Sequence, residues 1–172
     1  MHAGVEPDFV VGDMDSLHDK EVLERFPTDR VKTFSQDKDD TDTEIALKML
    51  FSENYDEVIL AGGGGGRMDH LIGILSLFDR TPHPSVWLTS GNEITAVDSL
   101  IARTDLQGCR VSFFPVGNES CHMRSEGLKW PLDGLVWQHG DVGISNQVVS
   151  STLRVEVLSG RLIMVRESEI ER

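Results

Sequence analysis

Apolar positions in the first half of the chain alternate between short runs and helical spacing. Residues 9–11 and 58–61 are short apolar runs, which are typical of buried strands. Residues 44–51 and 71–78 place apolar side chains three or four positions apart, as on one face of a helix. Strands that alternate with helices predict an α/β domain with a parallel sheet and crossover helices.

The pattern becomes β-like after two prolines that bracket His83. The dipeptides Gly91-Asn92 and Ser159-Gly160 each lie between two short apolar runs and are expected to form hairpin turns. The runs that they separate are residues 86–89 and 94–97, and residues 153–158 and 162–165. We therefore expect an α/β domain over residues 1–82 and an all-β, antiparallel sandwich domain over residues 83–172.

Charge and composition narrow the function. Of the 172 residues, 29 are acidic and 16 are basic, and the formal net charge is −13, which argues against nucleic acid or an anionic membrane surface as a partner. The uncharged apolar stretches are far shorter than the ~20 residues needed to span a bilayer, and the N-terminus lacks a secretory signal pattern, so a cytoplasmic protein is expected.

Cys109 and Cys121 match no metal or redox spacing and are expected to be free thiols.

The first cluster of polar residues, Gly-Asp-Met-Asp-Ser at 12–16, directly follows the first apolar run. If the backbone stays extended, Asp13 and Asp15 project to the same side beyond the carboxyl end of the strand. Open α/β sheets bind their ligands at that edge. One such aspartate commonly closes an Asx turn instead, but two at this spacing favour a metal site.

A second acidic cluster, residues 37–42, precedes the first predicted helix. Thr41 and Glu44 fit a capping box, which explains Thr41 without any ligand. It does not explain why four carboxylates lie within six residues. One helix dipole stabilises a nearby negative charge by only ~0.3–1 kcal/mol, which is less than the mutual repulsion of the four carboxylates. A bound cation would offset this repulsion, and oxygen ligands without a His or Cys cluster favour Mg²⁺ over zinc. A solvated acidic loop is the alternative.

Five consecutive glycines, residues 62–66, lie between the second predicted strand and a predicted helix. Their N–H groups can approach an anion closely, with the helix N-terminus behind them. No Gly-Lys-Ser/Thr sequence follows, so this is not a Walker A loop, and Arg67 offers a bidentate positive group instead. Asp69 and His70 fall in the first turn of the helix and are expected to face the bound anion. The alternatives are a flexible surface turn and a histidine that only packs or caps.

With these clusters, the chain resembles the thiamine pyrophosphokinases (thiamine diphosphokinases), which transfer a pyrophosphoryl group from ATP to the hydroxyethyl group of thiamine. Six segments match in the family's order: GDMDS at 12–16, DKDDTDTEIAL at 37–47, GGGGGRMDH at 62–70, FFPVG at 113–117, GLKWPL at 127–132 and GISN at 143–146. The resemblance implies an N-terminal α/β domain for the nucleotide and a C-terminal β-sandwich for thiamine. It also implies Mg²⁺ as cofactor, ATP as co-substrate, and a homodimer whose active sites lie between subunits.

The resemblance also gives roles to individual residues. The Mg²⁺-binding carboxylates of the family match Asp13, Asp15 and Asp42, with Asp39 as an additional candidate. The residues around the polyphosphate match Ser16, Thr41, Gly65, Gly66 and Arg67. Asp69 matches an acidic position near the reacting hydroxyl group, and the expected catalytic set is Asp69, Arg67 and Asp42. The thiamine-binding positions match Trp130, which would stack on the ligand, and Ser145 and Asn146 at a strand end.

In one respect the chain departs from the family. Members begin with a further segment of several dozen residues that includes an Ala-Asp-Gly-Gly type motif of the nucleotide site, and nothing before residue 12 matches it. We therefore expect an N-terminally truncated α/β domain with a reduced sheet, and weak or absent activity if the chain is truly truncated. A start assigned too far downstream and a divergent protein are the alternatives. The alternative functions are another Mg²⁺-dependent nucleotide phosphohydrolase, or a non-catalytic protein that binds thiamine or a nucleotide.

Overall fold

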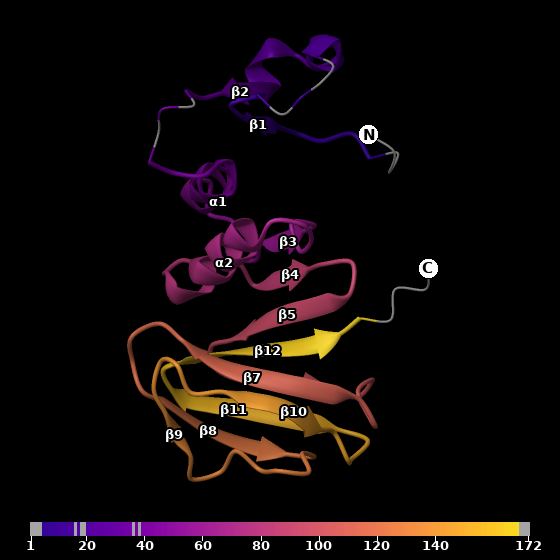
Figure 1. Cartoon of the computed structure of the whole chain (residues 1–172), viewed down its shortest axis with the longest axis vertical. Helices are drawn as coiled ribbons and strands as arrows, with labels where there is room; N and C mark the ends of the chain where they lie inside the picture. Colours follow the sequence, from indigo (N-terminus) through magenta and orange to yellow (C-terminus); the bar gives the residue numbers. More distant parts are fainter. Residues whose placement is uncertain (1–4, 16, 18–19, 36, 38, 169–172) are drawn as a thin grey trace. The chain divides into compact units, whose positions relative to one another are not determined.

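The computed structural model describes residues 5–15, 17, 20–35, 37 and 39–168 (Figure 1). The chain divides into two compact units, Met1–Tyr55 and Asp56–Arg172, called here the first and the second unit. Among the described residues, no helix is both long and apolar enough to cross a membrane.

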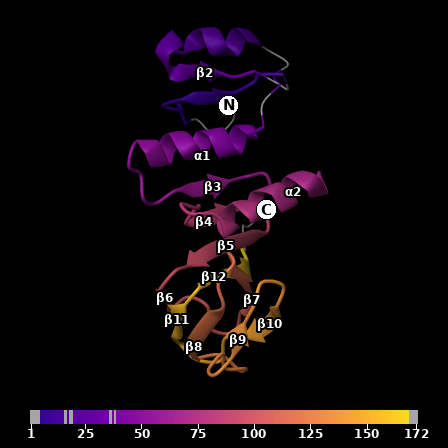
Figure 2. The same cartoon turned by 90° about the vertical axis from the view of Figure 1, so that its left-hand side faces the viewer.

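The first unit contains a parallel strand pair and one α-helix (Figure 2). Strands β1 (Val10–Gly12) and β2 (Val31–Thr33) pair in parallel, and the short 3₁₀ helices η1 (Lys20–Arg25) and η2 (Thr28–Arg30) lie between them in sequence. Helix α1 (Asp42–Ser52) follows and begins with the predicted capping box. The Thr41 hydroxyl accepts a hydrogen bond from the Glu44 N–H at 3.3 Å, and the Glu44 carboxylate accepts one from the Thr41 N–H at 2.7 Å. The predicted strand and helix are therefore confirmed.

The second unit opens with a β-α-β segment. Strand β3 (Ile59–Ala61) leads through the glycines into helix α2 (Met68–Ser76) and the 3₁₀ turn η3 (Leu77–Asp79), and the chain returns as strand β4 (Val86–Leu88), parallel to β3. Strand β5 (Asn92–Val97) then pairs with β4 in antiparallel fashion. The predicted hairpin at Gly91-Asn92 is confirmed.

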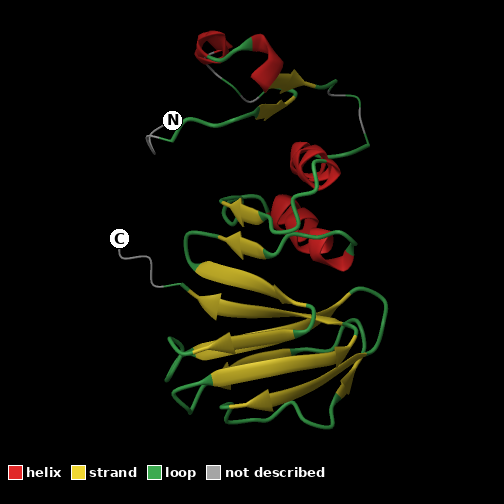
Figure 3. Cartoon of the chain, turned by 180° about the vertical axis from the view of Figure 1, so that it is seen from behind, coloured by secondary structure: helices red, strands yellow, loops and turns green. Residues whose placement is uncertain are grey.

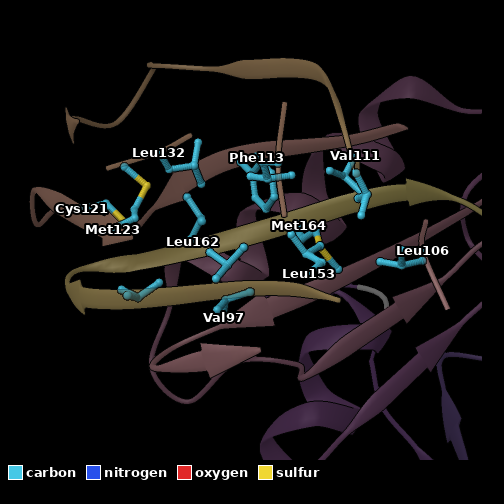
Figure 4. Packing of buried hydrophobic residues seen from close by; sticks show 14 residues of the cluster. Val97, Leu106, Val111, Phe113, Cys121, Met123, Leu132, Leu153, Leu162 and Met164 are labelled. Carbon is cyan, nitrogen blue, oxygen red and sulfur yellow. The ribbon is translucent and has the colours of Figure 1, made fainter. Parts of the chain in front are cut away.

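The remaining strands complete a sandwich of two sheets (Figure 3). They are β6 (Leu100–Arg103), β7 (Arg110–Val116), β8 (Cys121–Glu126), β9 (Val136–Trp137), β10 (Gly143–Gln147), β11 (Leu153–Ser159) and β12 (Arg161–Glu167). One sheet has the order β10-β7-β12-β5-β4-β3 and the other has the order β6-β11-β8-β9. Buried side chains from both sheets, such as Phe113 and Met164 from one and Met123 and Leu153 from the other, form one core (Figure 4). The antiparallel pairing of β4 to β12 in a sandwich is thus as predicted, although β3 pairs with β4 in parallel, and the described residues contain more strand than helix.

The second predicted hairpin, at Ser159-Gly160, is wrong. Strand β11 pairs with β6 and β8, whereas β12 pairs with β5 and β7, so the turn carries the chain from one sheet to the facing one. Gly160 has a φ of +73°, and a Cβ on it would lie 2.7 Å from the Ser120 carbonyl oxygen. Both strands have an apolar inward face, which suits a crossover in a sandwich as well as a hairpin.

The six-stranded sheet extends across the boundary expected at residue 82, because β3 precedes that residue and the other five strands follow it. The Arg161 guanidinium also donates to the carbonyl oxygens of Phe78, Asp79 and Arg80 at 3.3, 3.1 and 2.6 Å, and so caps the end of η3. Residues 56–82 therefore pack as one body with the sandwich. The assignment of separate functions to residues 1–82 and 83–172 stays a prediction.

Candidate active site

Two of the predicted metal ligands belong to one corner of the first unit. Strand β1 ends at Gly12, directly before Asp13, and α1 begins with Asp42. A Cβ on Gly12 would lie 2.8 Å from the Asp42 Oδ2 atom, so the Asp42 carboxylate is packed against the backbone of Gly12. The fold thus brings Asp42 beside the strand end that carries Asp13, although 29 positions separate the two in the sequence.

The expected extension of the backbone through Met14 is not observed. Met14 has a φ of +60° and a buried side chain, 8% exposed. The Asp15 N–H donates to Asp13 Oδ1 at 3.1 Å, which is the Asx-type hydrogen bond that the sequence left open as the alternative. Because β1 ends at Gly12 and Met14 is left-handed, the strand alternation that would put Asp13 and Asp15 on one side does not apply. Asp15 is exposed.

The acidic segment before α1 is partly neutralised by a lysine. Lys48 Nζ binds both carboxylate oxygens of Asp40, at 2.7 and 2.6 Å, while Asp39 is exposed. In the described parts of the chain, no group of three or more His, Cys, Asp or Glu side chains is placed to hold a metal ion. Asp13 and Asp42 still supply the hard oxygen atoms that Mg²⁺ prefers, and this ion commonly uses one or two carboxylates together with water and substrate phosphates. Ser16, a predicted nucleotide contact, lies outside the described residues.

The glycine loop, residues 62–66, joins β3 to α2 in the second unit. Its first residue is tied to β4, because the Gly62 N–H donates to the Leu88 carbonyl at 2.8 Å and the Trp87 indole N–H donates to the Gly62 carbonyl at 2.7 Å. Positive φ angles of +92°, +71° and +87° occur at Gly62, Gly63 and Gly66. These contacts and angles fix the path of the loop.

Gly64 and Gly65 differ in what surrounds them. A Cβ on Gly64 would lie 2.3 Å from the Thr89 side chain, so close packing excludes any larger residue there. A Cβ on Gly65 would meet nothing within 4 Å, and the φ of Gly65 is not in the left-handed region. The fold therefore explains a glycine at position 64 and leaves the one at position 65 unexplained.

Arg67 and Asp69, at the start of α2, bind each other. Arg67 Nε donates to Asp69 Oδ1 at 3.1 Å, and its Nη2 donates to Oδ2. The two side chains are 70% and 62% exposed. The hydrogen bond from Arg67 lowers the pKa of Asp69 to about 2, and the same bond raises the pKa of Arg67. Asp69 is therefore ionised at neutral pH, and the expected roles of Arg67 on phosphate and Asp69 near the acceptor stay predictions.

The predicted thiamine-binding residues gather on the sandwich. The Trp130 side chain is 55% exposed, and Lys129 Nζ lies 4.7 Å from its ring centroid. Asn146 is buried and hydrogen-bonded to the backbone of Trp130. Ser145, with a φ of +60°, is exposed, and its N–H donates to the Ser112 hydroxyl at 3.1 Å. The structure thus brings Asn146 and Trp130 together, and their roles in binding thiamine stay predictions.

A cavity of about 560 Å³ in the second unit was not predicted. Its lining includes apolar side chains of α2 and of the six-stranded sheet, such as Leu71, Leu75 and Phe114, and also Gly64 and His139. The sequence pattern gave no signal of it, because residues that line such a cavity have the same periodicity as residues that fill a core.

Comparisons with known proteins relate this chain to one family. Residues 1–88 match the family described as "Thiamin pyrophosphokinase, catalytic domain", and residues 99–162 match "Thiamin pyrophosphokinase, vitamin B1 binding domain". Thiamine pyrophosphokinase 1 of Arabidopsis thaliana is 30% identical over 88% of this chain and 62% of its own length. Thiamine pyrophosphokinase 2 of the same plant is 27% identical with the same coverage, so the chain spans 62% of the length of these two relatives.

Solved structures give the same result. The crystal structure of thiamine pyrophosphokinase from Bacillus subtilis superposes with a TM-score of 0.80 at 26% identity, covering 98% of this chain and 82% of that chain. The thiamin pyrophosphokinase from Geobacillus thermodenitrificans gives a TM-score of 0.74 at 29% identity, covering 99% of this chain and 81% of that chain. The chain therefore belongs to the thiamine pyrophosphokinase family.

Proposed function

We propose that this chain transfers the pyrophosphoryl group of ATP to thiamine, giving thiamine diphosphate and AMP. One observation carries the proposal: the catalytic-domain match over residues 1–88 and the vitamin B1-binding match over residues 99–162 lie in one chain, in that order. The first match contains the carboxylates and the glycine loop, and the second contains the exposed Trp130. A phosphohydrolase would need only the first set.

The polyphosphate is proposed to bind at the glycine loop. The amides of Gly65 and Gly66 and the N-terminus of α2 offer backbone N–H groups to an anion, and Arg67 adds a bidentate positive group. Gly65 supports this proposal because its lack of a side chain serves no packing need within 4 Å. Thr41 is fully accounted for by its capping box, so a phosphate contact there is the less supported part of the nucleotide assignment.

Mg²⁺ is proposed as the cofactor, held by Asp13 and Asp42 with Asp15 and Asp39 as further candidate ligands. When bound, it would neutralise charge on the phosphate oxygens. The residues of this chain then bind and orient the nucleotide, which is how proteins mainly accelerate phosphoryl transfer.

In the proposed reaction, the hydroxyl oxygen of thiamine attacks the β-phosphorus in line. The bond from the β-phosphorus to the oxygen that bridges it to the α-phosphorus breaks, AMP leaves, and the hydroxyl proton passes to a base or to water. Asp69 is the candidate base, but in the structure both its oxygens bind Arg67. A phosphate that binds the guanidinium would release Asp69 toward the acceptor.

Thiamine is proposed to stack on Trp130. Its thiazolium ring is a cation, and an indole face attracts cations within about 6 Å of the ring centroid. The Lys129 ammonium group at 4.7 Å already uses this property of the ring. From the sequence resemblance we also propose a homodimer with active sites between subunits. A cytoplasmic location is proposed from the sequence pattern.

An assay of AMP release that is coupled to a dehydrogenase tests the function. We expect AMP release that requires both thiamine and Mg²⁺, and about a hundredfold or greater loss in Asp42→Asn. The matched control is Asp40→Asn, which lies in the same acidic segment but pairs with Lys48 and is expected to retain activity. ATP consumption without thiamine would favour a phosphohydrolase. Calorimetric binding of thiamine without turnover would favour a non-catalytic binding protein.

A further inference from the structure

Strand β10 contains a bulge that turns Asn146 inward. Gly143 lies opposite Phe113 and Asn146 opposite Val111, so three steps on β10 match two steps on β7. The extra residue changes which side chains face the core. Ile144 is 66% exposed, whereas Asn146 is only 6% exposed.

The buried amide group of Asn146 binds the backbone of Trp130 on both sides. Its Oδ1 atom accepts from the Trp130 N–H at 3.2 Å, and its Nδ2 group donates to the Trp130 carbonyl at 2.7 Å. The Oδ1 atom also accepts from the Gln147 N–H at 2.8 Å. The Asn146 side chain therefore makes the two hydrogen bonds to Trp130 that the backbone of a neighbouring strand would make.

Neighbouring contacts hold the same segment but do not reach Trp130. The Lys129 N–H donates to the Gln147 carbonyl at 2.8 Å, and the Leu132 N–H donates to the Ser125 hydroxyl at 2.8 Å. Among the described residues, Asn146 is thus the only one whose side chain is hydrogen-bonded to the Trp130 backbone. A side chain that is buried and already bonded in this way is poorly placed to contact a ligand itself.

We propose that Asn146 is a positioning residue, which holds the backbone of Trp130 so that the indole ring stays presented as a platform for a flat cationic ligand. This gives Asn146 a role through Trp130 in place of direct ligand contact. The identity of the ligand as thiamine rests on the proposed function. The positioning of the ring does not.

Fluorine NMR of the full chain labelled with 5-fluorotryptophan tests the positioning directly. The chain has three tryptophans, and Trp130→Phe identifies the resonance of Trp130. In Asn146→Ala we expect this resonance to move toward that of free fluorotryptophan and to narrow, while those of Trp87 and Trp137 stay in place. Ser125→Ala, which removes a backbone contact two residues away, is the matched control and should leave the Trp130 resonance unchanged.

Titration with thiamine separates this proposal from the proposed function. Thiamine should shift the Trp130 resonance of the wild-type chain, and Asn146→Ala should need about tenfold more of it, as expected for the loss of hydrogen bonds that order the platform. In turnover, the KM for thiamine should rise by the same factor while kcat changes less than about twofold.

One result would overturn the positioning role of Asn146, and a different result would contradict thiamine as the ligand. An unchanged Trp130 resonance in folded Asn146→Ala overturns the positioning role. A displaced resonance in a chain that never responds to thiamine upholds the positioning role and contradicts thiamine as the ligand. If Asn146→Ala does not fold, Asn146→Asp decides, since it keeps the acceptor for the Trp130 N–H but loses the donor to the Trp130 carbonyl. An intermediate displacement supports the proposal, and none overturns it.

Discussion

Two arginine–carboxylate clusters in the second unit have the same chemistry and opposite surroundings. Arg67 and Asp69 pair at the start of α2 with side chains 70% and 62% exposed. Glu93 lies between Arg103 and Arg166, at 2.8 and 2.6 Å, and is 13% exposed. Exposed ion pairs contribute little to folding, whereas a mostly buried cluster is costly to break.

The Glu93 cluster behaves as a structural element. Burial alone would raise the pKa of Glu93, but hydrogen bonds from Arg166 and Arg103 outweigh it, and the net pKa is lowered. The Arg67–Asp69 pair is exposed, so its hydrogen bonds do not have to offset a cost of burying charge. Its position directly after the glycine loop agrees with the proposed role of Arg67 in binding phosphate, and the variants below compare that role with a role in stability.

The largest expected effect is on catalysis, in Arg67→Met. Removing the guanidinium group should lower kcat/KM by about 10²–10³-fold, as for other groups that stabilise developing charge. The urea midpoint should stay unchanged, because the pair is exposed. Arg124→Met, on the exposed side of β8, is the control. If Arg67→Met lowered the urea midpoint as much as a core substitution does, the role of Arg67 would be in stability and the proposed role in catalysis would be contradicted.

The second effect concerns stability, in Glu93→Ala. This change leaves two guanidinium groups without their shared partner and should lower the free energy of unfolding by about 3 kcal/mol. Asp105→Ala removes an exposed partner of Arg103 and should cost only about 0.5 kcal/mol. Urea unfolding measures both. Equal midpoints for the two variants would refute the structural role of Glu93.

The third prediction compares neighbouring glycines. Gly65→Ala should fold normally, because its Cβ meets nothing within 4 Å, but should lower kcat/KM by about tenfold or more, since the methyl group obstructs an anion. Gly64→Ala places a Cβ 2.3 Å from Thr89 and should destabilise the chain by about 1–3 kcal/mol. Full activity in Gly65→Ala would remove the main support for an anion site at this loop.

The smallest effect is on the titration of Asp69. Without the hydrogen bond from Arg67, its pKa should rise from about 2 toward the ordinary value of 3.8. The sign follows from linkage: a lowered pKa stabilises the folded chain above 3.8, and this contribution is lost as the pH falls toward 2. Carboxyl carbon NMR of wild type and Arg67→Met gives both values. An unchanged pKa would show that Arg67 does not bind Asp69 in solution.

Features that depend on adjacent residues were predictable from the sequence. The capping box at Thr41 and Glu44 and the hairpin at Gly91-Asn92 involve residues only a few positions apart, and both are present. The turn at Ser159-Gly160 was mistaken because its flanking strands have the same apolar alternation whether they pair with each other or face each other. The left-handed Met14 has no local signal, since neither glycine nor asparagine marks it.

Features of the site that depend on distant residues were predictable only in part. The resemblance named both Asn146 and Trp130 as candidate thiamine-binding residues, but it indicated neither the bulge in β10 nor the hydrogen bonds from Asn146 to the Trp130 backbone. Nothing in the sequence pairs Glu93 with Arg166, which are 73 positions apart. Arg67 and Asp69 were both predicted as site residues, yet their mutual hydrogen bonds were not.

The most direct test of the account is the stoichiometry of products by phosphorus NMR, with the full chain, MgATP and thiamine. Transfer predicts AMP and thiamine diphosphate in equal amounts, with both absent when thiamine is omitted. Formation of AMP with free pyrophosphate, or of ADP with phosphate, at the same rate without thiamine would contradict it.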